Sequence, residues 1–261
     1  MRVLGVIPAR WASTRLPGKV LVDLGGQPMI QRVWERARRA ESLDRLVVAT
    51  DDDRVEEACR RFGAEVVRTS PLALNGTERV AEAAAGVAAA IVVNVQGDEP
   101  LLPPAYVDRA VSALEESEGA ELATLGAPLA GAHDAEDPKI AKIVRNARGE
   151  ALYFSRSVVP HPFRGEAAKG VQPAGWLRHV SVYAYRREAL LALVHMRPGP
   201  LELREGLEQL RALEGGMRIV VAQVPEAPPS VDTPEDVRRV RDFLASRSAT
   251  REDGATSPVR V

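Results

Sequence analysis

At 261 residues the chain is long enough for one large α/β domain with room for an inserted lobe. Its hydrophobic fraction of 45% and charged fraction of 27% exclude a disordered or membrane-embedded chain. The 35 Lys and Arg residues against 36 Asp and Glu give a formal charge of -1, which excludes attraction to nucleic acid or an anionic membrane through overall charge. We therefore expect no nucleic-acid partner and no membrane insertion.

The sequence also predicts a cytoplasmic location. The N-terminus opens directly into a strand pattern at residues 3–7, without the features of a secretion signal. The longest apolar run, residues 83–93, is shorter than the ~20 residues of a membrane-spanning helix, and it is typical of a buried helix running into a buried strand. The single cysteine, Cys59, can form no disulfide within the chain, which fits a reducing compartment.

The first half of the chain alternates β-branched runs with helical periodicity. Strands are expected at residues 3–7, 46–49, 65–67 and 91–95. Helices are expected at 29–39, at 53–62 and in the Ala-rich segment before Ile91; the first has an apolar face made of Met29, Ile30, Val33, Trp34 and Ala37. Repeated strand–helix–strand units predict a Rossmann-like α/β fold, a mainly parallel sheet with helices on both faces.

After about Leu125 the pattern changes. Strand-like stretches at 140–144, 151–154 and 180–185 surround a Pro- and Gly-rich loop at 160–175, which predicts a smaller antiparallel lobe inserted at about residues 126–186. Helices near 188–196 and 202–213, a strand at 219–222 and a final helix from 234 to about 245 follow. We expect a single domain over residues 1–245 and a disordered polar tail at 246–261.

The strongest local signal is the basic segment at residues 8–19, directly after the first strand. Loops that leave the carboxyl ends of parallel strands line the ligand crevice, so Arg10, Arg15 and Lys19 are expected there. Three cations around one point suit a polyphosphate and a leaving pyrophosphate. The segment matches neither a P-loop nor a dinucleotide-binding glycine motif.

Two acidic residues are candidate metal ligands. Asp98 follows the buried strand at 91–95 and a glycine, although Gly-Asp before a proline is also good turn chemistry. Asp236 is explained as a capping residue of the final helix, with Thr233 as N-cap and Pro234 at the first position. Asp232 precedes that cap and is free to face the crevice. With the basic segment, Asp98 and Asp232 predict a Mg²⁺-assisted phosphoryl-transfer site.

Six blocks of sequence, in order between about residue 2 and residue 245, resemble the CMP-KDO synthetases, the 3-deoxy-manno-octulosonate (KDO) cytidylyltransferases. The blocks are residues 7–19, 75–79, 94–100, 151–156, 207–211 and 231–236. The resemblance implies a fold of the nucleotide-diphospho-sugar transferase type with a dimerising lobe, a homodimer, and transfer of CMP from CTP to KDO for lipopolysaccharide biosynthesis. It implies CTP and KDO as substrates and Mg²⁺ as cofactor.

The resemblance also implies roles for individual residues. Arg10, Lys19 and Asp98 would be catalytic, with Asp98 and Asp232 on the metal. The nucleotide would be bound by Ala9, Arg10, Arg15, Lys19, Thr77, Arg79 and Asp98. The sugar acid would be bound by Gln96, Arg156, His179, Tyr183, Glu208 and Gln209. Without the resemblance, His179 is more readily explained as a surface or core histidine, and Glu208 as part of a solvated helix face.

Other functions remain open at this stage. Related enzymes often carry Ser at the position of Asn75, His at the position of Ala73 and Gly at the position of Ser181. These changes affect the nucleotide loop and the sugar-facing strand, so another 2-keto sugar acid, such as an amino-KDO or a neuraminic acid, is an alternative acceptor. A sugar phosphate is a more distant one, and a catalytically silent nucleotide-binding protein is a further alternative.

Overall fold

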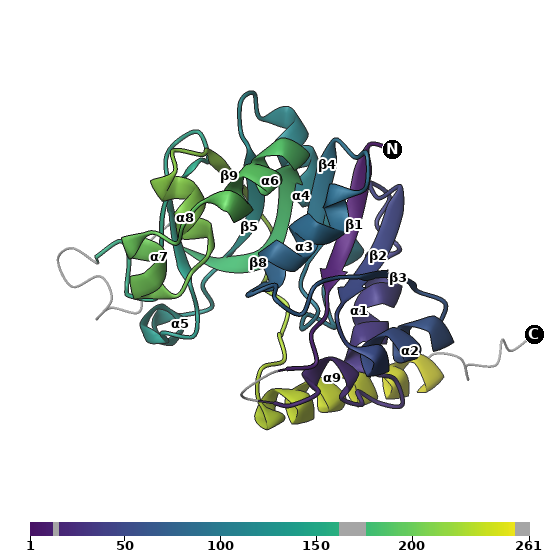
Figure 1. The fold of residues 1–261 in the computed structure, drawn as a ribbon. Coiled ribbons are helices and arrows are strands. Elements are labelled where there is room, and N and C mark those ends of the chain that lie inside the picture. The colour runs from purple at the N-terminus through teal and green to yellow at the C-terminus, as the bar shows by residue number, and fades with distance from the viewer. Residues whose placement is uncertain (13–15, 162–175, 254–261) are drawn as a thin grey trace, which may run out of the picture.

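The computed structural model describes residues 1–12, 16–161 and 176–253, and within them nine strands form one sheet (Figure 1). Its main path has the order β3-β2-β1-β4-β8-β5-β9. The strands are β1 (Val3–Pro8), β2 (Arg45–Thr50), β3 (Glu65–Arg68), β4 (Ile91–Val95), β5 (Leu122–Pro128), β6 (Lys142–Arg145), β7 (Ala151–Ser155), β8 (Leu177–Arg186) and β9 (Ile219–Gln223).

Helices cover both faces of this sheet (Figure 1). The helices of the described residues are α1 (Met29–Ala37), α2 (Asp53–Arg61), α3 (Gly76–Ala85), α4 (Pro104–Glu116), α5 (Ala132–Glu136), α6 (Arg187–His195), α7 (Pro200–Glu205), α8 (Gln209–Glu214) and α9 (Pro234–Asp253), with a 3-10 turn η1 (Lys19–Leu21). Of these, α1, α2 and α4 cover one face and α3, α6 and α8 the other. The expected strands and helices of the first half are all present, within a few residues of their predicted ends. The α/β fold with a mostly parallel, helix-flanked sheet is therefore confirmed.

Alternate side chains of each central strand are buried on opposite faces of the sheet, and they contribute to two hydrophobic cores. In β1, Val3 and Ile7 pack with α1, α2 and α4 on one face, while Leu4 and Val6 pack with α3, α6 and α8 on the other. Because side chains of a strand alternate between the faces, a strand covered on both sides must be apolar throughout. This explains the continuous hydrophobic run at the start of the chain and places β1 and β4 centrally.

The sheet is parallel from β3 to β4 and again between β5 and β9, but β8 runs antiparallel between β4 and β5. The segment expected as an inserted lobe therefore ends in a strand of the central sheet. Strands β6 and β7 form an antiparallel pair that is joined to the beginning of β8. Residues 162–175, most of the expected Pro- and Gly-rich loop, lie outside the described residues, and the lobe at 126–186 stays a prediction.

The helix predicted over 202–213 is wrong in one respect, because the structure has two helices there. Gly206 ends α7 in the left-handed region, with φ 62° and ψ 41°, and its N–H donates to the Glu202 carbonyl. This is a glycine C-cap, which satisfies a free carbonyl and turns the chain. Because the hydrophobic periodicity continues across Gly206, the sequence pattern predicts one helix and gives no sign of the break.

The final helix starts as predicted and ends later. Thr233 Oγ1 accepts from the Asp236 N–H, and Asp236 accepts from the Thr233 N–H, so the two residues form a reciprocal cap. Val237 and Val240 pack with Leu24 in a third apolar cluster. The helix runs to Asp253, into the expected tail, because no Gly or Pro interrupts it before Gly254; residues 254–261 lie outside the described part. Among the described residues, no helix has the length and apolar character needed to cross a membrane.

Candidate active site at the carboxyl ends of the first and fourth strands

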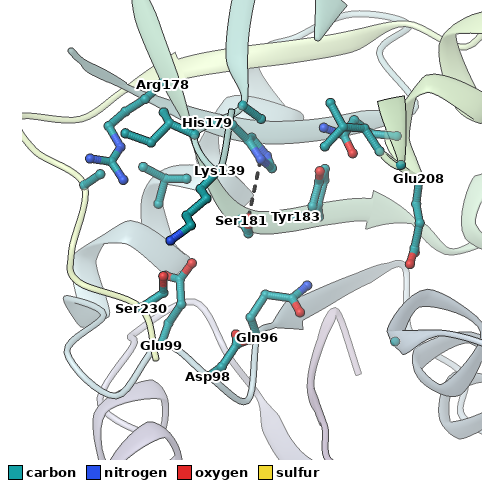
Figure 2. Close-up of a pocket in the computed structure, with 18 of the residues that line it drawn as sticks. Gln96, Asp98, Glu99, Lys139, Arg178, His179, Ser181, Tyr183, Glu208 and Ser230 are labelled. Atoms are coloured by element: carbon teal, nitrogen blue, oxygen red, sulfur yellow. Dashed lines mark hydrogen bonds between the residues drawn. The ribbon is translucent and has the colours of Figure 1, made fainter. Parts of the chain in front are cut away.

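Two cavities meet beyond the ends of β1 and β4. Both are lined by Gly76, Gln96, Asp98 and Glu208. The first, about 370 Å³, is also lined by Pro8, Arg10, Lys19, Val20, Leu74, Asn75, Arg79 and Gly97. The second, about 330 Å³, extends along β8, and Figure 2 shows its residues. Two ligands can therefore lie end to end with Asp98 between them.

The basic segment leads from β1 into the first cavity. Gly18 has a φ of 67° and lies against Trp11, where a Cβ would come within 2.8 Å of the indole ring, so the position requires glycine. Its N–H donates to the Trp11 carbonyl at 3.2 Å, which closes the loop. Arg10 and Lys19 both line the cavity, as predicted. Arg15 lies outside the described residues.

Lys19 joins the two acidic residues that the sequence indicates as metal ligands. Its Nζ lies 2.7 Å from Asp98 Oδ2 and 3.0 Å from Asp232 Oδ1. Burial by itself lowers the pKa of Lys19, but the charges and hydrogen bonds of the two carboxylates outweigh it and raise the pKa above its usual 10.5. The ammonium is therefore charged and shared between two loops that are far apart in sequence.

Close backbone contacts bring these loops together. A Cβ on Gly97 would lie 2.8 Å from the Pro8 carbonyl oxygen, so glycine allows the β4 loop to approach β1. The Val231 N–H donates to the Asp98 carbonyl at 2.9 Å, and the Asp232 N–H donates to Asp236 at 3.0 Å. Asp236 thus orients the loop that carries Asp232, besides capping α9.

The donors present fit a magnesium ion that a nucleotide completes. Asp98 and Asp232 offer carboxylate oxygens, and Mg²⁺ at nucleotide sites takes one or two carboxylates together with phosphate oxygens. In the described part of the chain, no group of three or more His, Cys, Asp or Glu side chains could hold a metal. The protein alone therefore provides an incomplete ligand set at this point.

Helix α3 provides the other wall of the first cavity. Asn75 caps it, accepting from the Glu78 N–H at 2.8 Å. The Arg79 side chain is 3% exposed and pairs with Asp51 at 3.3 Å and with Thr69, so it forms a fixed cationic wall. Thr77 lines the second cavity and not the first, and it donates to Glu208 at 2.7 Å, where the cavities meet.

Ala9 is the predicted nucleotide residue that the structure does not bring into the site. It lines neither cavity, its methyl group packs in the core, and its N–H donates to the Ala49 carbonyl.

The predicted sugar-binding residues all line the second cavity. These are Gln96, Arg156, His179, Tyr183, Glu208 and Gln209. Backbone carbonyls fix the Arg156 guanidinium: its Nε donates to Glu205 at 2.7 Å and its Nη1 to Pro138 at 3.0 Å. The Gln209 Nε2 is buried and has no partner within the described residues, so it is available to a ligand.

Burial shifts the titration of the side chains in this cavity. Desolvation lowers the pKa of His179 to about 3, so the imidazole is neutral near pH 7. Burial raises the pKa of Glu208, against the effect of the hydrogen bond from Thr77. It also raises the pKa of Tyr183 well above 10, assisted by Tyr185 and Glu208. The cavity wall is therefore polar, and its histidine and tyrosine side chains carry no charge.

Sequence reasoning missed three charged residues of the second cavity, Glu99, Lys139 and Arg178. Burial and the charge of Asp98 raise the pKa of Glu99 to about 8, against the hydrogen bond from the backbone N–H of Ser181. In Figure 2 the Lys139 side chain points toward Glu99. Glu99 directly follows Asp98 in the sequence and Arg178 directly precedes His179, so their neighbours could have indicated them. No feature of the sequence indicated Lys139.

Known proteins resemble this chain over most of its length. A family model described as cytidylyltransferase matches residues 4–219. The chain is 52% identical over 248 residues to the 3-deoxy-manno-octulosonate cytidylyltransferase of Xanthomonas campestris pv. campestris, covering 92% of this chain and 98% of that protein. It is 44% identical over 251 residues to the protein of the same name from Geobacter sulfurreducens, covering 94% and 100%.

Solved structures agree with these relatives. A CMP:2-keto-3-deoxy-manno-octonic acid synthetase complexed with CTP has a TM-score of 0.88 and 39% identity, covering 95% of this chain and 100% of its own. A nucleotidyl transferase from Methanothermobacter thermautotroptrophicus has a TM-score of 0.64 at 18% identity, covering 94% and 99%, and supports the fold alone.

Proposed function

The chain belongs to the cytidylyltransferase family, and from this premise we propose that it transfers CMP from CTP to 3-deoxy-manno-octulosonate. The observation that carries the proposal is Lys19 with Asp98 and Asp232 at the junction of two cavities. A cation and two carboxylates at such a junction suit phosphoryl transfer between a nucleotide on one side and an acceptor on the other. The product, CMP-KDO, would serve lipopolysaccharide biosynthesis.

On the nucleotide side, Arg10 and Lys19 bind the phosphates, and Arg15 joins them by its place in the basic segment. Arginine offers a fork of donors and lysine a point charge, so together they offset the charge of a triphosphate. Thr77 and Arg79 on α3 lie near the cytidine. Asp98 and Asp232 would hold Mg²⁺, which would supply charge stabilisation for the transfer when it is bound.

On the acceptor side, the fixed guanidinium of Arg156 suits the carboxylate of a sugar acid. The amides of Gln96 and Gln209, the neutral His179 and the Tyr183 hydroxyl offer hydrogen bonds to sugar hydroxyls, and Glu208 accepts from them. A cavity with these groups discriminates against an acceptor that leaves them unpaired.

The reaction forms one bond and breaks one. The anomeric oxygen of the acceptor attacks the α-phosphorus of CTP, the α–β phosphoanhydride bond breaks, and pyrophosphate leaves as the hydroxyl loses its proton. Lys19 and Arg10 stabilise the charge that develops on the leaving pyrophosphate, and the acceptor cavity holds the attacking oxygen in line. The chain's share is positioning and electrostatics, without a covalent enzyme intermediate.

The proposal includes a cytoplasmic homodimer. The homodimer follows from the resemblance to the CMP-KDO synthetases. Light scattering should give a mass near twice the 28.2 kDa of one chain. The location follows from the need for CTP.

Pyrophosphate release tests the function. With CTP and Mg²⁺, release is expected with KDO and absent without an acceptor or with a chelator. An amino-KDO, N-acetylneuraminate and a sugar phosphate serve as competing acceptors. Release with one of these alone would replace the acceptor, and CTP binding without release for any acceptor would support a silent nucleotide-binding protein instead.

A further inference from the structure

Strand β8 bulges at the wall of the second cavity. The neighbouring β5 residues Thr124 and Leu125 pair with Tyr183 and Val180, so two residues of β8 have no β5 partner in the register. The first of them, Ser181, lines the cavity. Bulges re-aim side chains and are frequent beside active sites. In the view of Figure 2, the Ser181 side chain lies between the His179 ring and the edge of the cavity formed by residues 96–98.

The hydroxyl of Thr124 determines which nitrogen of His179 carries a proton. Thr124 Oγ1 lies 2.9 Å from the Val182 carbonyl oxygen and 3.0 Å from His179 Nε2. The carbonyl can only accept, and the threonine has a single proton, so Thr124 donates to Val182 and accepts from His179. The reverse arrangement would put two oxygens 2.9 Å apart with no proton between them. His179 therefore carries its proton on Nε2.

The other nitrogen of His179 then determines the orientation of Ser181. The imidazole is neutral because it is desolvated, and its ring packs against Phe154 and Tyr183 with centroids 5.5 and 5.2 Å apart. With Nε2 protonated, Nδ1 is an acceptor. Ser181 Oγ lies 3.4 Å from Nδ1 and donates its proton to it. Because its proton is used in this bond, Ser181 Oγ can only accept further hydrogen bonds.

We propose that Ser181 determines acceptor specificity, its oxygen accepting a hydrogen bond from one hydroxyl of the sugar acid while Thr124 and His179 hold it in that role. The backbone N–H of Ser181 also faces the Glu99 carboxylate, whose pKa it lowers against the larger effect of burial. A group that only accepts selects a substrate that donates at that point. The inference rests on the proposed function and adds the chemistry of one contact to it.

Acceptor analogues test the contact. Ser181→Ala and Ser181→Gly should raise the KM for KDO by about three- to tenfold, the effect of one lost hydrogen bond, with the KM for CTP unchanged. Analogues in which one hydroxyl at a time is replaced by fluorine accept but cannot donate. The wild-type enzyme should discriminate against one of them, and Ser181→Ala should lose that additional discrimination. Discrimination equal in both proteins would overturn the inference.

The positioning role of Thr124 has its own readout. Thr124→Val should raise the KM for KDO to the level of Ser181→Ala, and Thr124→Ser should restore it. Nitrogen-15 NMR of the His179 ring should show the proton on Nε2 in the wild type and a mixture in Thr124→Val. A wild-type ring protonated on Nδ1 would overturn the hydrogen-bond chain.

The outcomes separate the two proposals. If the wild-type protein released pyrophosphate with no acceptor at all, the proposed function would fail and this inference with it. Normal KDO turnover with an unchanged KM in Ser181→Ala, in a variant whose thermal unfolding matches the wild type, would overturn this inference alone.

Discussion

Asp98 is the side chain on which the two cavities converge, and its charge should control turnover. Asp98→Asn keeps the shape but removes a negative charge that pairs with Lys19 at 2.7 Å. In the proposed reaction Asp98 would also be a metal ligand, so we expect pyrophosphate release to fall by about 10²-fold or more, the usual effect of losing one preorganised electrostatic group. Steady-state assays with saturating CTP and KDO measure it.

Asp53→Asn is the matched control for this change. The Asp53 side chain is 93% exposed and pairs with Arg68 on the surface of α2, outside both cavities. Its removal should leave turnover near the wild-type value, because exposed pairs contribute little. If Asp98→Asn behaved in the same way, the assignment of Asp98 to the metal would be wrong.

His179 predicts how stability depends on pH. Its pKa is about 3 in the folded protein against 6.5 as the usual value, so between these pH values the unfolded chain binds a proton that the folded one does not. The free energy of unfolding should therefore fall as the pH is lowered through this range, by roughly 3 kcal/mol between about pH 7 and about pH 4. Denaturant unfolding at several pH values measures the slope.

His179→Asn should flatten that slope, and His133→Asn, at an exposed position on α5, is the control variant. An identical slope in His179→Asn and the wild type would show that His179 binds its proton equally well in the folded and the unfolded chain. Burial would then not lower its pKa, and the neutral imidazole of the hydrogen-bond chain would be lost already at about pH 6.

The principal charged residues of the nucleotide cavity were predictable from sequence. Arg10, Lys19 and Asp98 follow parallel strands whose carboxyl ends share one edge of the sheet, so strand prediction alone brings them together. Lys139 was not predictable in this way, because its place depends on how the β6–β7 pair joins β8. No local spacing encodes that pairing.

Among the helices, the break between α7 and α8 supports the acceptor cavity. Arg156 Nη2 donates to the Gly206 carbonyl at 3.4 Å, and Gly206 has a φ of 62°. Gly206→Ala strains this turn by about 1 kcal/mol and shifts the carbonyl that holds Arg156. We expect a lower melting temperature and a higher KM for KDO, measured by thermal unfolding and steady-state kinetics.

Gly216 offers a matched comparison. It has a φ of 79°, and as at Gly206 an added Cβ would meet no atom within 4 Å, but Gly216 lines neither cavity. Gly216→Ala should lower the melting temperature by a similar amount and leave the KM for KDO unchanged. Equal KM values in both variants would show that Gly206 has no part in positioning Arg156.

The order of the strands was less accessible to sequence than their positions. Residues 177–186 were correctly expected to contain a strand, yet its place between β4 and β5 depends on pairing across more than 50 residues. Likewise, the hydrophobic periodicity of residues 202–213 fits one continuous helix, although Gly206 ends the first of two helices there. The pattern of hydrophobic residues predicts which face of a helix or strand is buried. It does not predict which other element packs against that face.

For the complete fold, nucleotide binding should be a global stabiliser. The first cavity joins the loop after β1, the start of α3 and the loop after β4, so CTP would link segments that are distant in sequence. Binding to the folded state alone adds about 2.7 kcal/mol at a ligand concentration of about 100 Kd. Thermal unfolding with CTP and Mg²⁺ should therefore show a clear rise in melting temperature.

Lys19→Ala should reduce this rise, and GTP in place of CTP is the control for base recognition. A chelator should reduce it as well, because the proposed cation links the phosphates to Asp98 and Asp232. A rise in Lys19→Ala as large as in the wild type would remove Lys19 from the phosphate site.

Lys19 already serves as an internal counterion for Asp98 and Asp232. A divalent cation held by Asp98 and Asp232 would compete with this ammonium, so the ammonium should weaken the binding of free cation. A bound triphosphate should favour cation binding, because its phosphates give the displaced Lys19 ammonium a new anionic partner. The two ligands should therefore bind with positive coupling, each strengthening the other. Without nucleotide the lysine offsets one of the two carboxylate charges. Because it exchanges these partners for phosphate when CTP binds, the site should take up the cation together with the nucleotide.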